Sequence, residues 1–459
     1  AIYKDGALAY SGSFGYADKQ KEQALELESV FAVASVSKAF TAAAIGLLVD
    51  EGLLNWDDRV VDHWPGFQMH DPYVTREMRV LDLLCHRNGY NTFDGDLLWY
   101  GTAGKYNRRE ILERFKALPP KHGFRNAYGY QNTMFIAAAI LIEEVSGLSW
   151  EDFVQKRIFT PLGMNNSFSH VKDARKAGKK ALPHIKGKSH EMQDYTNAAG
   201  AVGVHTHVLD MQPWLNMWMN AGMHGEEAFL KENTVRTILQ AHTSMGVSKG
   251  AEASGTHFSA AALGWFVKDQ YGKKIISHSG GLPGYILNVV MVPEEELAVV
   301  VFTNDETILP FAVSNYVIEA YLTGGAQDWV GQYGNYHDSR KEAAKKEQAA
   351  RLEEKNKRKK AHFSLKDALG VYTDAMYGNA NIKEVDGQFV LTLEPTDQWF
   401  TSSLEHWTGN TFRVQFKDPF LPDGFVTFEL DSHGQVLGFK IDLPNPDFHF
   451  YNLDFQKQQ

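Results

Sequence analysis

Three short motifs, which follow one another in a fixed order along the chain, carry residue types that together could perform acyl transfer. They are Ser35-Val36-Ser37-Lys38, Tyr130-Gln131-Asn132 and His278-Ser279-Gly280. A serine with a lysine one helical turn away is a nucleophile beside a base, and a tyrosine can carry a proton. Backbone N–H groups of a Gly-rich segment can stabilise an oxyanion. The set therefore predicts a covalent serine ester as the reaction intermediate.

Ser35 lies between a predicted strand and a predicted helix. Residues 29–33 are strand-like, and the apolar run of residues 39–49 ends at Gly52, a residue type that commonly follows a helix. Positions i and i+3 share one helix face, so the Lys38 amine can approach the Ser35 hydroxyl. The start of the helix offers free N–H groups and a positive dipole end to a developing oxyanion.

The Ser-x-x-Lys pattern by itself also fits a structural role. A serine that caps a helix, followed by a lysine that reaches solvent, gives the same spacing. Ser169-His170-Val171-Lys172 repeats the pattern, and because the polar residues 172–176 follow, we expect Ser169 at the surface. The other two motifs distinguish Ser35, because Tyr130 precedes a helix predicted over residues 133–145 and His278 follows a strand predicted over 273–276.

With these motifs, the chain resembles the serine β-lactamase and penicillin-binding-protein superfamily, in the branch of class C β-lactamases, D-aminopeptidases and related esterases. The resemblance covers roughly residues 1–330. Besides the three motifs, it rests on four segments in the expected order, residues 83–89, 161–164, 199–202 and 263–265. It implies an α/β (α+β) fold, in which an antiparallel sheet with flanking helices lies beside an all-helical lobe and the site lies at their junction.

The resemblance also implies a role for each catalytic residue. Ser35 is the acylated nucleophile, and Lys38 and Tyr130 take its proton and later return one to the leaving group. Asn132 orients the lysine and binds the substrate amide. The N–H groups of Ser35 and Gly281 form the oxyanion hole.

His278 and Gly280 are expected to support substrate binding, and His278 is a departure from the pattern of many relatives. Those relatives have the lysine of a Lys-Thr-Gly motif at this position, which provides a fixed positive charge for a substrate carboxylate. Histidine is mostly neutral near pH 7. The change favours a peptidase, for peptides that include D-residues, or an esterase over a β-lactamase or D,D-carboxypeptidase. The alternative to a role in substrate binding is a structural one, in which His278 ends a strand and forms a hydrogen bond with the backbone.

The composition is that of a globular enzyme. The chain has 459 residues, 44% hydrophobic and 22% charged, which is enough for a large core and more than one domain. A formal net charge of −10 argues against a general nucleic-acid binder, and no apolar run is long enough to span a bilayer. The single cysteine, Cys85, excludes an intrachain disulfide and a cysteine-based metal site.

Several histidines lie between residues 184 and 207, which raises the alternative of a zinc site. His190-Glu191 begins like the zinc motif His-Glu-x-x-His, but Gln193 and Asp194 follow and the second histidine is missing. We therefore interpret these histidines as loop residues and predict no metal and no cofactor.

Three regions are expected along the chain. They are a β-lactamase-like hydrolase domain over residues 1–332, a charged helical linker over 333–362 and a small all-β barrel over 363–459. The barrel is predicted from short strands separated by turns, at residues 370–372, 380–385, 388–393, 411–416, 425–430 and 436–441. It resembles the lipocalin-like domain attached to some members of the family. Its His406, Trp407 and Phe420 either line a cleft or belong to the barrel core and rim.

Two classes of function are left open by the sequence. One is an active serine hydrolase whose partner is a small-molecule or short-peptide substrate, and the other is a catalytically silent binding protein on the same fold. No nucleic-acid partner is expected, and a homo-oligomer is an open alternative. Because residue 1 is not methionine and relatives usually carry a helix and often an export signal upstream, we expect a trimmed N-terminus and favour a periplasmic or secreted location.

Overall fold

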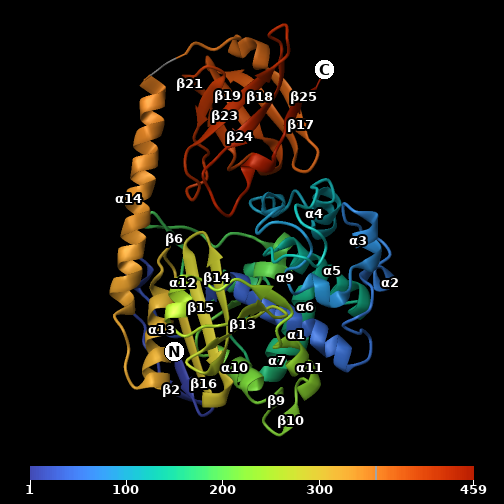
Figure 1. Cartoon of the computed structure of the whole chain (residues 1–459), viewed down its shortest axis with the longest axis vertical. Helices are drawn as coiled ribbons and strands as arrows, with labels where there is room; N and C mark the ends of the chain where they lie inside the picture. The colour runs from blue at the N-terminus through green and yellow to red at the C-terminus, as the bar shows by residue number, and fades with distance from the viewer. Residues whose placement is uncertain (357–358, 459) are drawn as a thin grey trace. The chain divides into compact units, whose positions relative to one another are not determined.

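The computed structural model describes residues 1–356 and 359–458, and the chain divides into two compact units. Unit 1 comprises residues 1–92 and 120–334, and unit 2 comprises residues 93–119 and 335–459. In Figure 1 the sheet of unit 1 is drawn mainly in yellow and the strands of unit 2 in orange and red.

Unit 1 is built on an antiparallel sheet of eight strands in the order β11-β12-β13-β14-β15-β16-β1-β2. The strands are β1 (Ile2–Lys4), β2 (Ala7–Tyr10), β11 (Thr243–Met245), β12 (Ser259–Ala261), β13 (Phe266–Gln270), β14 (Lys273–Leu282), β15 (Tyr285–Val292) and β16 (Leu297–Thr303). The sheet thus joins the first residues of the unit to residues 243–303. Strands β15 and β16 form an antiparallel hairpin, with its turn at Pro293–Glu295.

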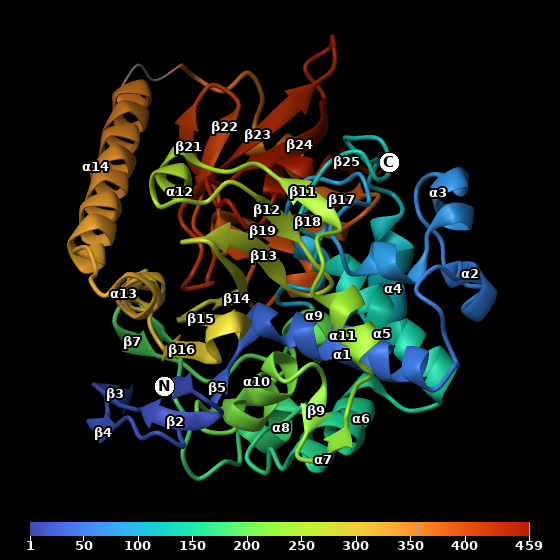
Figure 2. The same cartoon turned by 60° about the horizontal axis from the view of Figure 1, so that its bottom comes forward.

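The central strands β15 and β16 are apolar at successive positions, without alternation of apolar and polar residues. This pattern is expected of strands that are covered on both faces. Helix α13 (Leu309–Thr323) packs against β15 and β16, and Ile318 joins Val290 and Val299 in one core cluster. Helix α10 (Met211–Met219) and the short helix η1 (Ala34–Val36) also contact β15. Figure 2 shows α13 and α10 on opposite sides of the sheet.

Helix α1 (Ser37–Asp50) forms the centre of the helical part, and its side chains are buried from Ser37 to Leu48. It packs against α5 (Thr133–Ser146), α9 (Ala199–Val202) and α11 (Glu232–Ile238). Its many alanines allow close approach of these neighbours, and Thr41 accepts a hydrogen bond from Trp150 Nε1 (2.9 Å). A helix that is apolar all round is expected to be buried in this way.

Short elements complete unit 1. They are β3 (Tyr16–Asp18), β4 (Gln23–Ala24), β5 (Phe31–Ala32), α2 (Val60–His63), α3 (Pro72–Glu77), α6 (Trp150–Val154), α7 (Thr160–Leu162), α8 (Val171–Ala174), β6 (His184–Ile185), β7 (Lys188–Ser189), β8 (His205–Thr206), β9 (Met223–His224), β10 (Glu227–Ala228) and α12 (Lys249–Ala253). Among the described residues, no single helix has both the length and the apolar composition of a membrane span; α5 and Trp150–Leu162 have them only jointly, as a pair bent by 76°.

Unit 2 contains the predicted barrel, an antiparallel sheet of nine strands in the order β20-β19-β18-β17-β25-β24-β23-β22-β21. The strands are β17 (Gly370–Asp374), β18 (Gly378–Val385), β19 (Gln388–Leu393), β20 (Thr401–Ser403), β21 (Glu405–Thr408), β22 (Thr411–Val414), β23 (Gly424–Leu430), β24 (Val436–Asp442) and β25 (Phe455–Lys457). Its two end strands, β20 and β21, are separated in sequence by Leu404 alone, so the sheet curls until the barrel is nearly closed.

Aromatic side chains fill the barrel interior. Phe439 stacks on Phe455 with ring centroids 4.8 Å apart, and Phe400 and Phe450 lie 5.3 Å apart. Trp407 is buried against Phe425, while Phe420 is half-buried and His406 is exposed.

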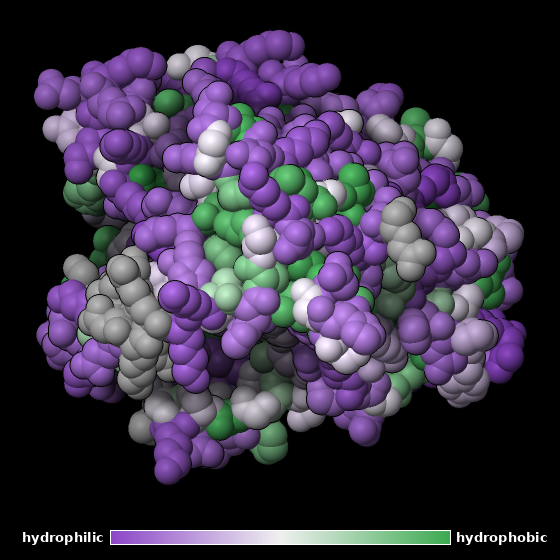
Figure 3. All heavy atoms as spheres, turned by 90° about the horizontal axis from the view of Figure 1, so that it is seen from above, coloured by the Kyte–Doolittle hydropathy of each residue, from purple (hydrophilic) through white to green (hydrophobic). Residues whose placement is uncertain are grey.

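Figure 3 shows one face of the molecule as largely hydrophilic, with hydrophobic side chains gathered near its centre.

Unit 2 also includes residues 93–119, which the sequence boundaries placed within residues 1–332. The Tyr100 ring stacks on Phe448 at 3.9 Å, and its hydroxyl donates to Asp418 Oδ2 (2.8 Å). In the same segment helix α4 (Arg108–Phe115) follows Tyr106, whose hydroxyl donates to the Tyr377 carbonyl (2.8 Å). Helix α14 (Trp329–Asn356) covers much of the predicted charged linker.

Candidate active site

Ser35 lies in the short helix η1, directly before α1, and its backbone is fixed on both sides. Ala34 has a left-handed φ of 49°, which is uncommon for a residue with a Cβ atom. The N–H of Val33 donates to the Val204 carbonyl (2.9 Å), and the N–H of Val204 donates to Ser37 Oγ (2.9 Å). The Ser35 side chain is half-buried, so its hydroxyl is held at a defined place at the start of α1.

Lys38 is fully buried, and its Nζ has three acceptors from three parts of unit 1. It donates to Ser35 Oγ (3.0 Å), Asn132 Oδ1 (2.6 Å) and the Ala201 carbonyl (3.1 Å). The amide and carbonyl oxygens can only accept hydrogen bonds. When the amine is neutral, its two N–H groups can stay with Asn132 and Ala201, and its lone pair then replaces the N–H that faces Ser35 Oγ. The geometry is that of a base positioned to take the serine proton.

Tyr130 belongs to the same group of residues, because Lys38 Nζ lies 4.9 Å from the centroid of its ring. The Tyr130 side chain is buried, and its backbone N–H donates to Thr92 Oγ1 (3.1 Å). Its ring stacks on Phe266 of β13, with centroids 6.3 Å apart. Phe135 of α5 also faces the amine, with its ring centroid 5.4 Å from Nζ.

Gly280 brings β14 directly against the turn that carries Ser35. A Cβ atom at Gly280 would lie 2.5 Å from the Val33 carbonyl oxygen and 3.1 Å from the Cβ of Ala34. Only a residue without a side chain allows this approach. Gly281 follows in the same strand, paired with Ile286.

His278 is buried in the interior of β14, so it does not end the strand, but its ring does bond the backbone as the structural alternative expects. Its Nδ1 lies 2.6 Å from the Ser279 carbonyl, an acceptor, so Nδ1 carries the proton. Its Nε2 is buried and has no hydrogen-bond partner among the described residues. Burial, and then the charge of Lys38, lowers the pKa of His278 to about 3. The imidazole is therefore neutral, and the site lacks a fixed cation at this position.

The structure thus brings together Ser35, Lys38 and Asn132 by direct hydrogen bonds, and Tyr130 by ring contact. The His278 ring lies 6.3 Å from that of Tyr130. Reasoning from the sequence missed Ala201, His86, Phe135 and Phe266 as neighbours of these residues. Ala201 and His86 lie within two of the four segments that carried the resemblance, 199–202 and 83–89, which was the available signal.

The expectation that Ser169 lies at the surface is wrong. Ser169 is 3% exposed, and its Oγ donates to the Glu151 carbonyl (2.8 Å). Its hydroxyl therefore satisfies a buried backbone acceptor, which is a structural role.

The histidines between residues 184 and 207 make separate structural contacts. His184 Nε2 accepts from the Lys19 N–H (3.1 Å), and His205 Nδ1 pairs with the Gly203 carbonyl (3.1 Å). Within residues 1–356 and 359–458, no group of three or more His, Cys, Asp or Glu side chains is arranged to hold a metal ion.

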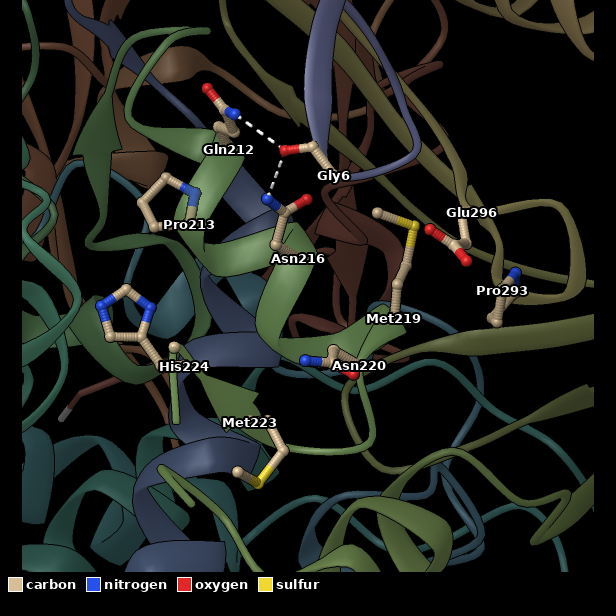
Figure 4. A pocket seen from close by; sticks show the side chains of 11 residues that line it. Gly6, Gln212, Pro213, Asn216, Met219, Asn220, Met223, His224, Pro293 and Glu296 are labelled. Atoms are coloured by element: carbon tan, nitrogen blue, oxygen red, sulfur yellow. Dashed lines mark hydrogen bonds between the residues drawn. The ribbon is translucent and has the colours of Figure 1, made fainter. Parts of the chain in front are cut away.

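A separate cavity of about 600 Å³ lies beside α10 (Figure 4). The Gly6 carbonyl projects into it and accepts hydrogen bonds from Gln212 Nε2 (3.0 Å) and Asn216 Nδ2 (2.8 Å). Glu296 and Pro293 line the side of the cavity that lies away from Gln212 and Pro213. The described residues that line this cavity include none of the three motifs.

Two sequence families match the chain. The family described as Beta-lactamase matches residues 1–322, and the Domain of unknown function (DUF3471) matches residues 354–457. The first match covers the three motifs and most of unit 1.

Curated relatives are similar over the same region. Penicillin-binding protein 4* of Bacillus subtilis (strain 168) is 27% identical over 325 residues, which are 66% of this chain and 66% of the relative. Unguisins hydrolase ungD of Aspergillus violaceofuscus is 26% identical over 325 residues, 65% of this chain and 57% of the relative. The chain thus spans less than two thirds of the length of these relatives.

A solved structure resembles the whole chain. The octameric penicillin-binding protein homologue from Pyrococcus abyssi is 20% identical and has a TM-score of 0.61, with 99% of this chain and 94% of that chain covered. At this identity the likeness establishes the fold, a mixed sheet-and-helix unit together with a barrel.

Proposed function

The chain belongs to the Beta-lactamase family, and on this premise we propose that it is a serine hydrolase, which cleaves amide or ester bonds of small substrates through an acyl-enzyme on Ser35. The substrates we propose are short peptides, including those with D-residues, and esters. The observation that carries the proposal is the arrangement of Lys38 Nζ between Ser35 Oγ and two carbonyl-type acceptors.

The reaction follows from that arrangement. Ser35 Oγ attacks the substrate carbonyl carbon while its proton passes to Lys38, with Tyr130 beside both groups. The N–H groups of Ser35 and Gly281 receive the oxyanion, whose preorganised stabilisation lowers the barrier by several kcal/mol. The C–N or C–O bond then breaks, and the leaving group takes the proton. Water attacks the ester in the same way, which releases the acid and restores Ser35.

The neutral His278 supports a peptidase or esterase over a β-lactamase or D,D-carboxypeptidase. A substrate carboxylate would meet a buried, uncharged imidazole where many relatives place a lysine. Desolvation of a carboxylate without a compensating charge costs several kcal/mol. Penicillin-binding activity is the alternative that the names of two similar proteins favour.

The octameric state of the Pyrococcus abyssi homologue supports a second proposal, that this chain forms homo-oligomers. Light scattering of the purified chain tests it directly, and a monomer over the working range of concentration would contradict it.

Labelling with a fluorophosphonate tests the hydrolase proposal. We expect one adduct by intact mass, mapped to Ser35, lost in Ser35→Ala and retained in Ser169→Ala. Ser169→Ala is the matched control because Ser169 carries the same Ser-x-x-Lys pattern. A panel of peptide amides, esters and β-lactams then identifies the substrate. A native chain that takes no label and turns over none of them would instead be a binding protein on the same fold.

A further inference from the structure

We propose that His86 is a positioning residue that holds Tyr130 against Lys38, and that its substitution slows acylation of Ser35 by releasing Tyr130. The inference rests on the proposed function, because it assigns Tyr130 to the proton transfer there.

His86 binds the chain on both sides of Tyr130. The N–H of Gly129 donates to the His86 carbonyl (3.0 Å), and the N–H of Gln131 donates to His86 Nδ1 (3.1 Å). The residues immediately before and after the tyrosine are thus fixed by one histidine. Gly129 has no room for a side chain, since a Cβ atom there would lie 1.9 Å from the Tyr90 carbonyl oxygen.

The His86 ring also packs directly on the Tyr130 ring, with centroids 4.4 Å apart and planes inclined by 31°. On other sides it contacts Phe266 (6.1 Å) and Phe135 (5.5 Å), and the histidine is 2% exposed. Neighbours that are packed at interior density leave a side chain few alternative rotamers. The ring and the two hydrogen bonds therefore fix both the backbone and the side chain of Tyr130.

The position of His86 is itself anchored by buried charge. Arg87 Nε donates to Asp82 Oδ1 (2.7 Å), Arg125 Nη2 donates to Asp82 Oδ2 (2.6 Å), and Asp82 is fully buried. The N–H of Arg125 donates to the Arg87 carbonyl (2.7 Å). His86 has a left-handed φ of 59°, which this network holds.

The hydrogen bond from Gln131 requires a neutral imidazole, because Nδ1 must offer a lone pair to a backbone donor. Burial, and then the nearby Lys38 amine, lowers the pKa of His86 well below its ordinary value. The clamp on Tyr130 is therefore formed throughout the neutral range of pH.

The test compares two substitutions of nearly equal shape. Asn Oδ1 occupies the place of histidine Nδ1, and Asn tolerates a left-handed backbone, so His86→Asn keeps the acceptor for Gln131. His86→Leu has the same branching and no acceptor. The readout is the rate constant for fluorophosphonate labelling of Ser35, measured with each variant in the native background and in Tyr130→Phe.

We expect His86→Leu to slow labelling about 10- to 100-fold, as a small misplacement of a catalytic group does, and His86→Asn to stay within about threefold of the native rate. In the Tyr130→Phe background, His86→Leu should add almost nothing, because residues that act as a unit have non-additive effects. His184→Leu is the matched control, since it also removes a buried imidazole that accepts a backbone N–H, and it should label at the native rate.

Equal rates for His86→Leu and His86→Asn, or effects of His86→Leu and Tyr130→Phe that multiply, would overturn the proposal. Should His86→Leu fail to fold, His86→Gln replaces it, because its amide group lies one bond further from Cβ and misses the Nδ1 position. A native chain that takes no label at all would refute the proposed function instead, so the two failures are distinguishable.

Discussion

Lys38 is a buried amine whose acceptors come from η1, from the start of α5 and from α9. Its substitution therefore affects stability as well as chemistry. Lys38→Ala should abolish labelling and lower the free energy of unfolding by about 2–4 kcal/mol, since it leaves a cavity and removes the buried amine that bonds Asn132 and the Ala201 carbonyl. Ser35→Ala should abolish labelling equally and change stability by less than about 0.5 kcal/mol, because the hydroxyl is half-exposed.

Urea denaturation of the two variants beside the native chain measures both effects. A Lys38→Ala variant that still takes the label would remove Lys38 as the base. A Ser35→Ala variant as unstable as Lys38→Ala would mean that Ser35 has a structural role.

His278 determines the charge that a substrate meets at β14. His278→Lys should raise the ratio of kcat/KM for a carboxylate-bearing substrate over its amide by at least about tenfold, because a charge-assisted hydrogen bond replaces contact with a neutral ring. His278→Gln, which stays neutral, is the control and should leave the ratio near its native value. If carboxylates, including β-lactams, gain nothing from the lysine, our interpretation of this position is wrong.

Residue contacts were predictable where they are local. The spacing of Ser35 and Lys38 on one helix face predicts their hydrogen bond, which the structure shows at 3.0 Å. The polar residues 172–176 predict that Ser169 lies at the surface, and this fails because Ser169 is buried against the Glu151 carbonyl, which lies outside that segment. The role of His86 also depends on its left-handed φ, which is uncommon for a residue with a Cβ atom and cannot be predicted from the residue type.

At the scale of elements, a comparison of two glycines of similar φ distinguishes the stability cost of backbone strain from that of lost close packing. Gly264 and Gly272 have φ of 68° and 74°, but a Cβ atom at Gly264 would lie 2.5 Å from the Lys38 carbonyl oxygen, and one at Gly272 meets nothing within 4 Å. Gly272→Ala should cost about 1 kcal/mol of stability through strain alone. Gly264→Ala should cost at least about twice as much and slow labelling of Ser35, because it pushes α1 away at Lys38.

Thermal unfolding and labelling rates of the two variants measure these costs. Equal losses of stability with unchanged labelling would show that α1 tolerates the added methyl group.

Strand β14 explains why part of the element pattern was not predictable. A strand is predicted over residues 273–276, and His278 is expected to follow it. The ladder instead continues to Leu282, with Gly280 opposite Leu287. The glycine is needed because η1 approaches the strand there, a tertiary requirement that overrides local preference. In β15 and β16 local pattern and burial agree, since both strands are apolar over most of their length and buried.

For the whole molecule, buried neutral histidines predict acid sensitivity. Burial lowers the pKa of His205 to about 4, below the ordinary value near 6.5. Between these values the unfolded chain binds more protons, so the free energy of unfolding falls as pH drops from 6.5 towards 4. His205→Asn should therefore reduce the loss of stability between pH 7 and pH 5 by about 1–2 kcal/mol.

Urea denaturation at the two pH values measures this loss. His170→Asn, at an exposed position, is the control for removal of a histidine from the surface. A loss of stability that is the same in the native chain and in His205→Asn would contradict the linkage.

The division of the chain into units was predictable only in part from the charge and hydropathy pattern of the sequence. The charge of residues 333–362 and the alternating strands that follow indicate a helix and a barrel, and both are present. Residues 93–119 carry no such signal, because Trp99 and Tyr100 would suit any apolar core. Their partners, Phe448 among them, lie more than three hundred residues away in sequence.

The packing of residues 93–119 on the barrel residues predicts what happens when the chain is truncated near the domain boundary that the sequence composition suggests. A chain that ends at residue 334 loses the partners of Trp99 and Tyr100, which are 3% and 1% exposed in the whole protein. Trypsin should then cut after Lys105 or Arg109 faster than in the complete chain, because exposed apolar segments without partners lose their fixed structure. Mass spectrometry of a digestion time course identifies the cut sites.

The same truncation should also slow labelling of Ser35. Residues 91 and 92, directly before the segment, hold the Tyr130 loop: the Asn91 carbonyl accepts from Gln131 Nε2 (2.5 Å), and Thr92 Oγ1 accepts from the Tyr130 N–H (3.1 Å). Loss of order at residue 93 frays these contacts and releases the tyrosine. Native labelling in a truncated chain that trypsin does cut within residues 93–119 would show that Tyr130 is held by His86 without help from Asn91 and Thr92.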